Sequence, residues 1–580
     1  MNINGTTQNC LPADPLWSRK LLYLDAPEFI LGPILGLLAQ GLLRRFEPRS
    51  VTGFAAIPAA GLLLPYTLLS YNLLQSTITL LTFLLVLASS ILYYRLLSNS
   101  HPLHHIPGPV LARSTQLYQL YQLYLGRPRV DQQRLHQHYG PVVRIGPNEV
   151  SICDASMLQP VFGAKPWQKG TAYSFTASGG ASTSETALSS IRDHEEHKAR
   201  RRIWDRAFSI SALKNYQPFI AFRVQQLCDQ FDKIAIKGEI VDLQEWIHYL
   251  VFDVMTDLAW GGGGDATLRG RDPDGAIASL RYSLHLAGLT KALPWFAKIL
   301  IQLPSVERQT REFKRFAKHM FETRAAAGTS QNKEKATDVF YHLLGEGNPD
   351  KTDQLSIGAL QADSRQVVTG GADTTVSAIT YLLYCLLCSP PHYAKLQSAL
   401  DSLPKDPTNN GLFSHDDLAK HPILEASIAE AMRLQPPIPY QNQRIVPAGG
   451  VTVSDIFIPP GTNTRTAIYA LSRSAEHFTD PDSFRPERWL ATERKPDEIF
   501  NAKASLPFLT GPYHCVGRNF AWQEMRYTVA TLVSRYDIRL ADGERFDKLA
   551  FEALVQDRSV LEIEGALKVR ITRRKTEDCA

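Results

Sequence analysis

One cysteine of the sequence has neighbours that suit metal chemistry. It is Cys515, in the run Phe508-Leu-Thr-Gly511-Pro-Tyr-His-Cys515-Val-Gly517-Arg-Asn-Phe-Ala521. The glycines on either side predict an open loop, and the residues that follow predict an amphipathic helix. Backbone N–H groups in such a loop stabilise the negative charge of a thiolate, which is the form of cysteine that binds metals. The alternative is a buried free cysteine, which is what a lone cysteine usually is.

An acid and an alcohol follow a pair of glycines within a long apolar stretch. Gly370 and Gly371 precede Asp373 and Thr374, in a helix that the pattern predicts over about 356–387. Each mid-helix glycine costs about 1 kcal/mol relative to alanine, and the close approach of a flat ligand to the backbone would explain both. A structural alternative for Thr374 is that its hydroxyl bonds a carbonyl of its own helix, four residues earlier.

Three charged residues have the spacing of a buried ion network. Glu430 and Arg433 lie three apart, so a helix places them on one face. Arg488, in Phe484-Arg-Pro-Glu-Arg488-Trp489, is the candidate third member. The first pair is a weak signal by itself, because an acid and a base three residues apart occur by chance in most long helical proteins.

Two further segments offer basic residues that could bind an anionic group. His197 and Arg201 lie one helical turn apart in a segment that begins at Asp193, and Arg444 lies in Gln443-Arg444-Ile445. Surface ion pairing is the alternative for these basic residues. We expect the neighbouring Arg200 and Arg202 to face elsewhere, on a solvated or partner-binding surface.

The order and spacing of these motifs resemble the cytochrome P450 family, the haem-thiolate monooxygenases, from about Ile106 to the C-terminus. The resemblance implies haem b as the cofactor, with Cys515 as the axial thiolate ligand of its iron. It also implies that Asp373 with Thr374 delivers protons to dioxygen. Members of the family that rearrange peroxides often lack this alcohol, so its presence favours a monooxygenase.

The resemblance assigns further residues by their places in the motifs. Residues expected to bind the haem are His197, Arg201, Arg444, Tyr513, Phe508, Gly511 and Gly517, and the expected structural triad is Glu430, Arg433 and Arg488. The sequence departs from the family at Tyr513, where many members carry a basic residue that binds a haem propionate. A phenol donates one hydrogen bond but brings no charge. Haem retention is therefore expected to depend on the other basic residues, with the ring of His514 as a further candidate.

The first hundred residues are far more apolar than the rest. No charged residue occurs between Val51 and Tyr94, and a bilayer span takes about 20 apolar residues. A buried helical hairpin in a soluble fold is the alternative. The pattern predicts a membrane region over 1–100, with spans at 29–43, 54–69 and 73–94.

Basic residues flank the outer two spans, which are followed by Arg44, Arg45, Arg49 and Arg95. The positive-inside rule places both of these flanks in the cytosol. Three spans would put the N-terminus in the lumen, where Asn4 fits the glycosylation pattern, although two basic residues near the N-terminus argue the other way. We expect an endoplasmic reticulum membrane protein whose catalytic domain, residues 101–580, is cytosolic.

The remainder of the chain is predicted to be mainly α with a minor β part, the cytochrome P450 fold. Helical periodicity dominates, and short β-like pieces occur near 142–145, 451–458 and 561–571. The stiff turn at 106–109 contains two prolines, which restrict the backbone. Such a turn would orient a globular domain that follows it.

Composition excludes several classes of protein. The 580 residues include 62 Lys and Arg against 57 Asp and Glu, without the concentrated basic runs of a nucleic-acid binder. The seven cysteines are odd in number and lie far apart in the sequence. This pattern does not suit a disulfide scaffold. Cys385 and Cys388 form a CxxC that we expect to be two buried small apolar residues.

No glycine-rich phosphate cradle for flavin or nicotinamide occurs in the sequence, so electrons must come from another protein. The resemblance implies NADPH–cytochrome P450 reductase, which would dock on the face that carries the Cys515 loop. The basic candidates for that contact are Lys198, Arg200, Arg202 and Arg518.

The expected function is insertion of one oxygen atom from O2 into a lipophilic small molecule of specialised metabolism. Alternatives are a haem-thiolate isomerase or dehydratase, and a non-catalytic haem-binding membrane protein. The substrate is expected to contact Gln366, Val367 and Thr369, the run 437–439 and the loop 173–187.

Overall fold

The computed structural model describes residues 27–45, 59, 63, 67, 72–174, 186–293, 300, 302–327, 338–345, 355–406, 412–440, 442–541 and 552–574. The chain divides into two compact units, Met1–His101 and Pro102–Ala580. Each unit is described separately below.

The first unit contains two packed helices, α1 (Pro27–Arg45) and α3 (Leu73–Leu96). Gly32 and Gly36 lie where α1 meets α3, and a Cβ at Gly32 would collide with Thr82 and with the backbone at Thr79. This is the small-residue spacing that lets apolar helices approach closely. Asn72 begins α3 with a capping box, accepting a hydrogen bond from the Gln75 amide at 2.9 Å.

One helix of the described part of the chain is long and apolar enough to cross a membrane by itself, and it is α3. The span predicted at 73–94 falls on this helix. The apolar part of α1, Phe29–Arg44, is shorter than a full span. The span predicted at 54–69 and the glycosylation candidate Asn4 fall outside the continuously described residues.

The second unit is mainly helical, as the sequence predicts, and the strands are few and short. Its helices are α4 (Val110–Ser114), α5 (Leu117–Tyr124), α6 (Pro128–Tyr139), α7 (Leu158–Phe162), α8 (His194–Ala207), α9 (Ile210–Lys237), α10 (Leu243–Trp260), α11 (Ala266–Arg269), α12 (Ala276–Ala292), α14 (Pro304–Ala327), α15 (Val339–Leu343), α16 (Ile357–Leu387), α17 (Pro390–Asp401), α18 (His415–Ala419), α19 (Pro422–Leu434), α20 (Ile468–Ser472) and α21 (Arg518–Arg535).

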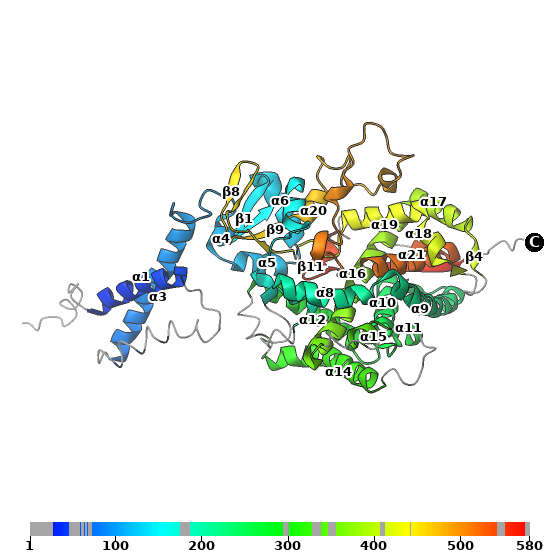
Figure 1. The fold of residues 1–580 in the computed structure, drawn as a ribbon, viewed down its shortest axis with the longest axis horizontal. Coiled ribbons are helices and arrows are strands. Elements are labelled where there is room, and N and C mark those ends of the chain that lie inside the picture. Colours follow the sequence, from blue (N-terminus) through cyan, green and yellow to red (C-terminus); the bar gives the residue numbers. More distant parts are fainter. Residues whose placement is uncertain are drawn as a thin grey trace, which may run out of the picture. The chain divides into compact units, whose positions relative to one another are not determined.

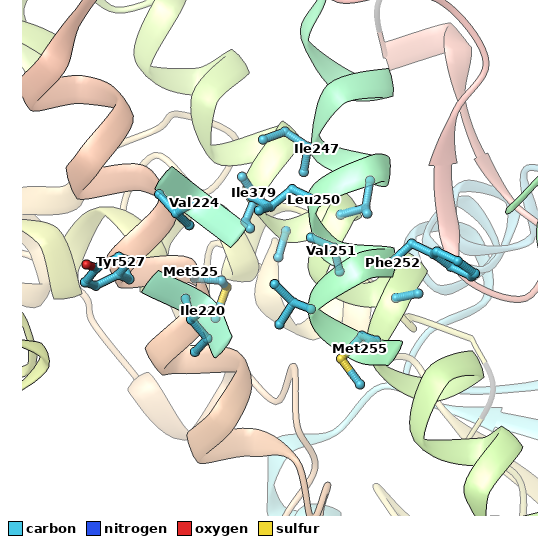
Figure 2. Close-up of a cluster of buried hydrophobic side chains, with 14 of the residues drawn as sticks. Ile220, Val224, Ile247, Leu250, Val251, Phe252, Met255, Ile379, Met525 and Tyr527 are labelled. Carbon is cyan, nitrogen blue, oxygen red and sulfur yellow. The ribbon is translucent and has the colours of Figure 1, made fainter. Parts of the chain in front are cut away.

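Helix α16 runs through the main hydrophobic core. It begins after Ser356, whose side chain accepts a hydrogen bond from the Ala359 amide, and its C-terminal half is buried on nearly all sides. A helix that is apolar all round is stable only when neighbours cover it. Figure 2 shows side chains of the neighbouring helices that cover α16. Leu250 on α10, Val224 on α9 and Met525 on α21 lie near Ile379 of α16.

The strands form small sheets at the edges of the helical core. The largest has the order β1-β2-β9-β6, in which β2 pairs antiparallel with β1 and parallel with β9. In Figure 1, β1 and β9 lie near α6 and α20, whereas α9, α10 and α21 lie together. The strand bounds are β1 (Val142–Gly146), β2 (Glu149–Ile152), β3 (Ile240–Asp242), β4 (Lys405–Asp406), β5 (Leu412–Phe413), β6 (Arg444–Ile445), β7 (Val451–Val453), β8 (Ile456–Ile458), β9 (Asn463–Thr466), β10 (Tyr536–Leu540), β11 (Val555–Asp557), β12 (Leu561–Ile563) and β13 (Lys568–Arg573).

The prediction for the CxxC pair is half wrong. Cys385 is buried inside α16, but Cys388 is exposed. The helix ends at Leu387, and Cys388 is its C-cap residue. The end of α16 lies outside the core, so Cys388 is exposed even though the sequence around it is apolar.

Candidate functional site

A cavity of about 450 Å³ lies between α8, α16, strand β6 and the loop before α21. That volume is in the range of small-molecule and cofactor sites. Most of its lining is apolar, and the polar groups are concentrated on a few elements. Predicted site residues that line it are His197, Arg201, Thr374, Arg444, Phe508, Tyr513, Cys515 and Gly517.

The loop that carries Cys515 places its sulfur at the cavity wall. The Cys515 amide donates to the Phe508 carbonyl at 2.9 Å, and α21 begins three residues after the cysteine. Burial raises the pKa of the Cys515 thiol, whereas the Gly517 amide, Arg201 and the Arg518 amide lower it. The start of α21 therefore offers N–H groups that stabilise a thiolate.

Gly511 allows this loop to turn tightly against helix α7. Its φ is +69°, in the left-handed region that glycine adopts without strain. A Cβ at this position would also collide with the carbonyl oxygen of Phe162 at the end of α7. Gly511 thus shapes the loop, although it is not among the residues that line the cavity.

Helix α16 presents a glycine and a hydroxyl to the cavity. A Cβ added at Gly370 would meet no atom within 4 Å, whereas one at Gly371 would collide with the Met255 side chain. The Thr374 hydroxyl donates to the Gly370 carbonyl at 2.7 Å. The intrahelical bond, which the sequence offered as an alternative, is therefore present. Its proton is directed at the backbone, so the Thr374 oxygen keeps its lone pairs to accept a hydrogen bond.

Asp373 does not line this cavity. Successive residues of a helix point about 100° apart, and Asp373 lines a separate small cavity with His248 and His285. Burial raises the pKa of Asp373 to about 6, and Arg281 acts in the opposite direction. The structure therefore places the acid and the alcohol on different faces of α16.

The structure brings Glu430, Arg433 and Arg488 together with no solvent exposure of any of their side chains. Arg433 donates from Nε to Glu430 at 2.8 Å and from Nη2 at 2.9 Å, and Arg488 donates from Nε at 3.0 Å. Trp489 adds a fourth hydrogen bond to the carboxylate, at 2.9 Å. The remaining guanidinium donors meet backbone carbonyls, such as that of Ser472 at 2.6 Å.

Arg444, His197 and Tyr513 meet at one end of the cavity. The Arg444 guanidinium lies 5.3 Å from the centre of the Tyr513 ring, and the His197 ring packs edge-on against it. The Nε of Arg444 is buried and has no hydrogen-bond partner among the residues that the structure describes. Burial lowers the pKa of His197 to about 3, helped by Lys169, Arg201, His194 and Arg444, so this imidazole is neutral.

Lys169 joins these groups and was missed by the sequence analysis. Its ammonium lies 4.9 Å from the centre of the Tyr513 ring and donates to the Ser189 carbonyl at 2.8 Å. Burial, with Arg444 and Arg201, lowers the pKa of Lys169 to about 7. The residue stands in Trp167-Gln-Lys169-Gly170 without a motif around it, so only the fold shows where it points.

Arg201 reaches the cavity, but its guanidinium is largely engaged by protein. It donates to Asp205 at 2.8 Å, to the His514 carbonyl at 2.8 Å and bonds the His514 ring at 3.0 Å. His514 thereby ties α8 to the loop that carries Cys515.

The prediction that Arg200 belongs to a solvated or partner-binding surface is wrong. Arg200 is buried, and its Nε donates to Asp363 of α16 at 2.8 Å. Asp363 also accepts from Trp204 at 3.0 Å and from the Leu188 amide at 2.9 Å. The face of α8 that carries Arg200 packs on α16, which basic sequence context alone did not reveal.

The described residues that line the cavity include Lys169, Arg201, Arg444 and Lys291 but no Asp or Glu. Arg201 has its own acid in Asp205, but burying the charges of Lys169 and Arg444 is costly unless an anion compensates them, so the site fits a ligand that carries negative charge. The open space over Gly370 and the thiol of Cys515 add a place for a flat ring and a metal donor. Together these features fit a haem, whose propionates the basic residues would hold.

The expected substrate contacts are partly met. Gln366, Val367, Thr369, Pro437, Ile438 and Tyr173 line the cavity, whereas Pro439 does not, and residues 175–185 of the expected loop fall outside the description. Leu284 and Lys291 of α12 also line it and were not foreseen. No sequence motif predicts that α12 lines this cavity.

Comparison with known proteins gives the family. The chain matches the sequence model described as Cytochrome P450 over residues 108–561. Because this match covers most of the chain, the protein belongs to the cytochrome P450 family. The family binds a thiolate-ligated haem iron and uses dioxygen, a substrate and a redox partner, so these predictions are confirmed at that level.

Curated fungal relatives cover most of the chain. Cytochrome P450 67 of Uromyces fabae is 34% identical over 93% of this chain and 98% of its own length. Tryprostatin B 6-hydroxylase of Aspergillus fumigatus is 31% identical over 86% of each chain. A cytochrome P450 monooxygenase, orf5, of Eupenicillium brefeldianum is 33% identical over 78% of this chain and 88% of its own. The protein is therefore a monooxygenase.

Proposed function

We propose that this protein is a membrane-anchored haem b monooxygenase that inserts one oxygen atom from O2 into a lipophilic small molecule of specialised metabolism. The observation that carries the proposal is a thiol at the wall of a largely apolar cavity that also holds a cluster of cations and has no Asp or Glu among its described lining residues. Fungal relatives named as monooxygenases and as a hydroxylase support the same reaction class.

The chain's own residues divide the work of holding the haem. Cys515 would supply the thiolate, with the first amides of α21 stabilising its charge. Lys169 and Arg444 would pair with the propionates, and the Tyr513 hydroxyl would add an uncharged hydrogen bond. When bound, a thiolate-ligated haem supplies an electron-rich iron that favours cleavage of the O–O bond.

Thr374 and Asp373 would serve the proton steps from two sides of α16. Thr374 presents an accepting oxygen to the cavity because its own proton is donated to Gly370. Asp373 holds a proton whose pKa, about 6, is close to neutral pH, as proton transfer requires. This pair favours a monooxygenase over a haem-thiolate isomerase or dehydratase.

Electrons would come from NADPH through NADPH–cytochrome P450 reductase. Lys198 and Arg202 on α8 and Arg518 at the start of α21 are exposed basic residues close in sequence to the site. They would pair with acidic groups of the reductase. Arg200 takes no part, because it is buried.

The membrane proposal rests on α3, which would anchor the protein in the endoplasmic reticulum with the catalytic domain in the cytosol. The positive-inside rule applied to Arg44, Arg45 and Arg95 supports this orientation. Protease treatment of intact microsomes should then degrade the catalytic domain. Full protection would contradict the orientation, whereas an unglycosylated Asn4 would weaken only the version with three spans.

The haem ligand is tested by its spectrum. The reduced, CO-bound protein should show the red-shifted Soret band of a thiolate ligand, and Cys515→Ala should abolish it. Cys388→Ala, which removes an exposed cysteine at the end of α16, is the matched control and should leave the band unchanged. A Cys515→Ala protein that keeps the band would refute the assignment.

Catalysis is tested by reconstitution with the reductase and NADPH. The wild-type protein should consume NADPH and form an oxygenated product with a substrate identified by a spectral binding screen of lipophilic scaffolds. Thr374→Ala should continue to consume NADPH while hydrogen peroxide replaces product. A protein that binds haem but consumes no NADPH with any compound would instead be a non-catalytic haem-binding protein.

A further inference from the structure

A second, polar cavity lies against α16 on the face that carries Asp373. Val376, Ser377 and Thr380 line it beside Asp373, at the spacing of one helical stripe. Its volume is about 10 Å³, which is room for one water molecule. Thr374, the neighbour of Asp373, lines the large cavity and not this one. The two cavities therefore meet α16 at adjacent residues.

The other walls come from three elements that are distant in sequence. Helix α10 contributes Gln244 and His248, α12 contributes Leu284 and His285, and the β11–β12 hairpin contributes residues 560–563, among them Glu562. His285 bonds the Glu562 carboxylate through Nε2, and Arg281 of α12 pairs with the other carboxylate oxygen. Glu562 is thus held at the cavity wall by two partners from α12.

Exposure falls along these groups from the surface toward the cavity. The side chain of Arg281 is 37% exposed, that of His285 is 26% exposed, and that of Glu562 is 12% exposed. Solvent therefore reaches the outer side of the pair formed by His285 and Glu562, whereas its inner side faces the cavity that Asp373 shares.

Two buried polar atoms of the lining have neither a hydrogen bond nor an ion pair with any residue that the structure describes. They are the hydroxyl oxygen of Thr380 and Oε1 of Gln244. Buried polar atoms are normally hydrogen-bonded, and a site that is polar and just large enough for one water satisfies them by holding that water. The cavity therefore fits a bridging water between Glu562 and Asp373.

We propose that the His285–Glu562 pair and the water that this cavity would hold form a proton inlet that recharges Asp373 from solvent, on the face of α16 away from the haem cavity. The inlet rests on the proposed function, because it serves the proton step at Asp373. Glu562 is the proton carrier, and His285 and Arg281 are positioning residues that hold its carboxylate toward the cavity.

The transfer conserves protons at every position. When Asp373 gives up its proton toward Thr374, its carboxylate takes one from the cavity water. The water regains a proton from the His285–Glu562 pair, and the pair regains one from solvent. One proton enters for each that leaves, and no electron moves.

The charges around Asp373 suit this role. Burial raises its pKa to about 6, so both protonation states are accessible near neutral pH. The titratable and charged groups that face it are His248 from α10, Arg281 and His285 from α12, and Glu562 from β12. Burial and Arg281 lower the pKa of His248 to about 3, which leaves Glu562 as the acid of this cavity that touches the surface.

The test replaces Glu562 by glutamine, which keeps the size of the side chain and one accepting oxygen but does not carry a proton. The assay uses the full-length protein with reductase and NADPH and no added substrate, and measures NADPH oxidation, peroxide release and the solvent deuterium isotope effect. Glu562→Gln should slow NADPH oxidation about tenfold and raise the isotope effect. Glu564→Gln, two residues further on the same strand region and paired with Arg558, should match the wild type.

A double variant separates a proton route from a structural role. Asp373→Asn should slow the same reaction, and adding Glu562→Gln to it should cause no further change, because one route is already closed. The CO-bound spectrum should be unchanged in all variants. Additive effects, or an unaltered isotope effect in Glu562→Gln, would overturn the inlet.

The inlet and the proposed function fail in different ways. If the wild type consumes NADPH and Glu562→Gln behaves identically, the inlet is wrong and the function stands. If the wild type consumes no NADPH with the reductase, either alone or with any lipophilic compound added, the monooxygenase proposal falls, and the inlet falls with it.

Discussion

Two buried clusters of positive charge in this protein differ in how they are compensated. The triad around Glu430 places two guanidinium groups on one carboxylate, and backbone carbonyls accept their remaining hydrogen bonds. The cluster of Lys169 and Arg444 faces a cavity whose described lining contains no acid, and the Nε of Arg444 has no partner. The positive charges of the triad are therefore compensated within the chain, whereas the cluster of Lys169 and Arg444 lacks an anion among the described lining residues.

This difference shows which charges stabilise the fold and which serve a ligand. Breaking a complete buried pair leaves an uncompensated charge and is strongly destabilising. Removing a charge from an incomplete cluster relieves a desolvation cost in the free protein instead. Variants of the two clusters should therefore change stability in opposite directions, and haem retention should respond only to the second.

The largest effect is expected from Glu430→Ala. The substitution leaves Arg433 buried without its acid and leaves Arg488 with only the longer pair to Glu498 at 3.5 Å, so the free energy of unfolding should fall by about 3–5 kcal/mol. Chemical denaturation followed by far-UV circular dichroism measures it. Glu425→Ala is the matched control on the same helix, because Glu425 pairs with Arg526 at a partly exposed site and should cost at most about 1 kcal/mol. Equal losses from the two variants would contradict the contrast.

A smaller loss is expected from Arg200→Ala. Asp363 would lose its ion pair but would keep hydrogen bonds from Trp204 and the Leu188 amide. The free energy of unfolding should fall by about 2–3 kcal/mol. Arg202→Ala, an exposed neighbour on α8, should change it by less than about 0.5 kcal/mol. If Arg200→Ala lowers the free energy of unfolding no more than Arg202→Ala does, the packing of α8 on α16 does not depend on the ion pair with Asp363.

Lys169→Met probes the incomplete cluster. The haem-free protein should be as stable as the wild type or more stable, because a buried cation has been removed. The haem should dissociate about tenfold faster, equivalent to about 1.4 kcal/mol, because a partner of its propionates is lost. Transfer of haem to an acceptor globin measures this rate. Lys165→Met, an exposed lysine in the same segment, is the control, and a Lys169→Met protein that holds haem as tightly as that control would refute the role.

Tyr513→Phe should have the smallest effect. The ring that Lys169 and Arg444 contact is retained, and only the hydroxyl, 3.3 Å from Nδ1 of His194, is removed. Haem dissociation should change by less than about fivefold, since one uncharged hydrogen bond is worth about 1 kcal/mol or less. A change larger than that of Lys169→Met would mean that the phenol, and not the ammonium, is the main anchor.

The sequence predicts the parts of the site that follow from local spacing. The Cys515 loop, the helix over 357–387 and the pair Glu430–Arg433 each depend on short-range periodicity and turn chemistry. The separation of Asp373 from Thr374 follows from the same helical geometry, since consecutive residues point to different faces, although the motif suggests a joined pair.

The remaining features depend on contacts between distant segments. Lys169 and Arg200 stand in basic or mixed contexts that are typical of surface loops and helices. Their burial results from the packing of the segment after α7 beside β6 and of α8 on α16. Likewise, Glu562 meets His285 only because the β11–β12 hairpin folds over α12. Local pattern carries no signal for these contacts.

The open space above Gly370 gives protein engineers a control over selectivity. An added methyl group there meets no atom within 4 Å and improves helix propensity by up to about 1 kcal/mol. Alanine at position 370 would therefore be the locally more stable choice, and glycine keeps volume free instead. A graded series of Ala, Val and Leu at this position would narrow the cavity stepwise, so bulky compounds should be excluded first while slender ones are still accepted.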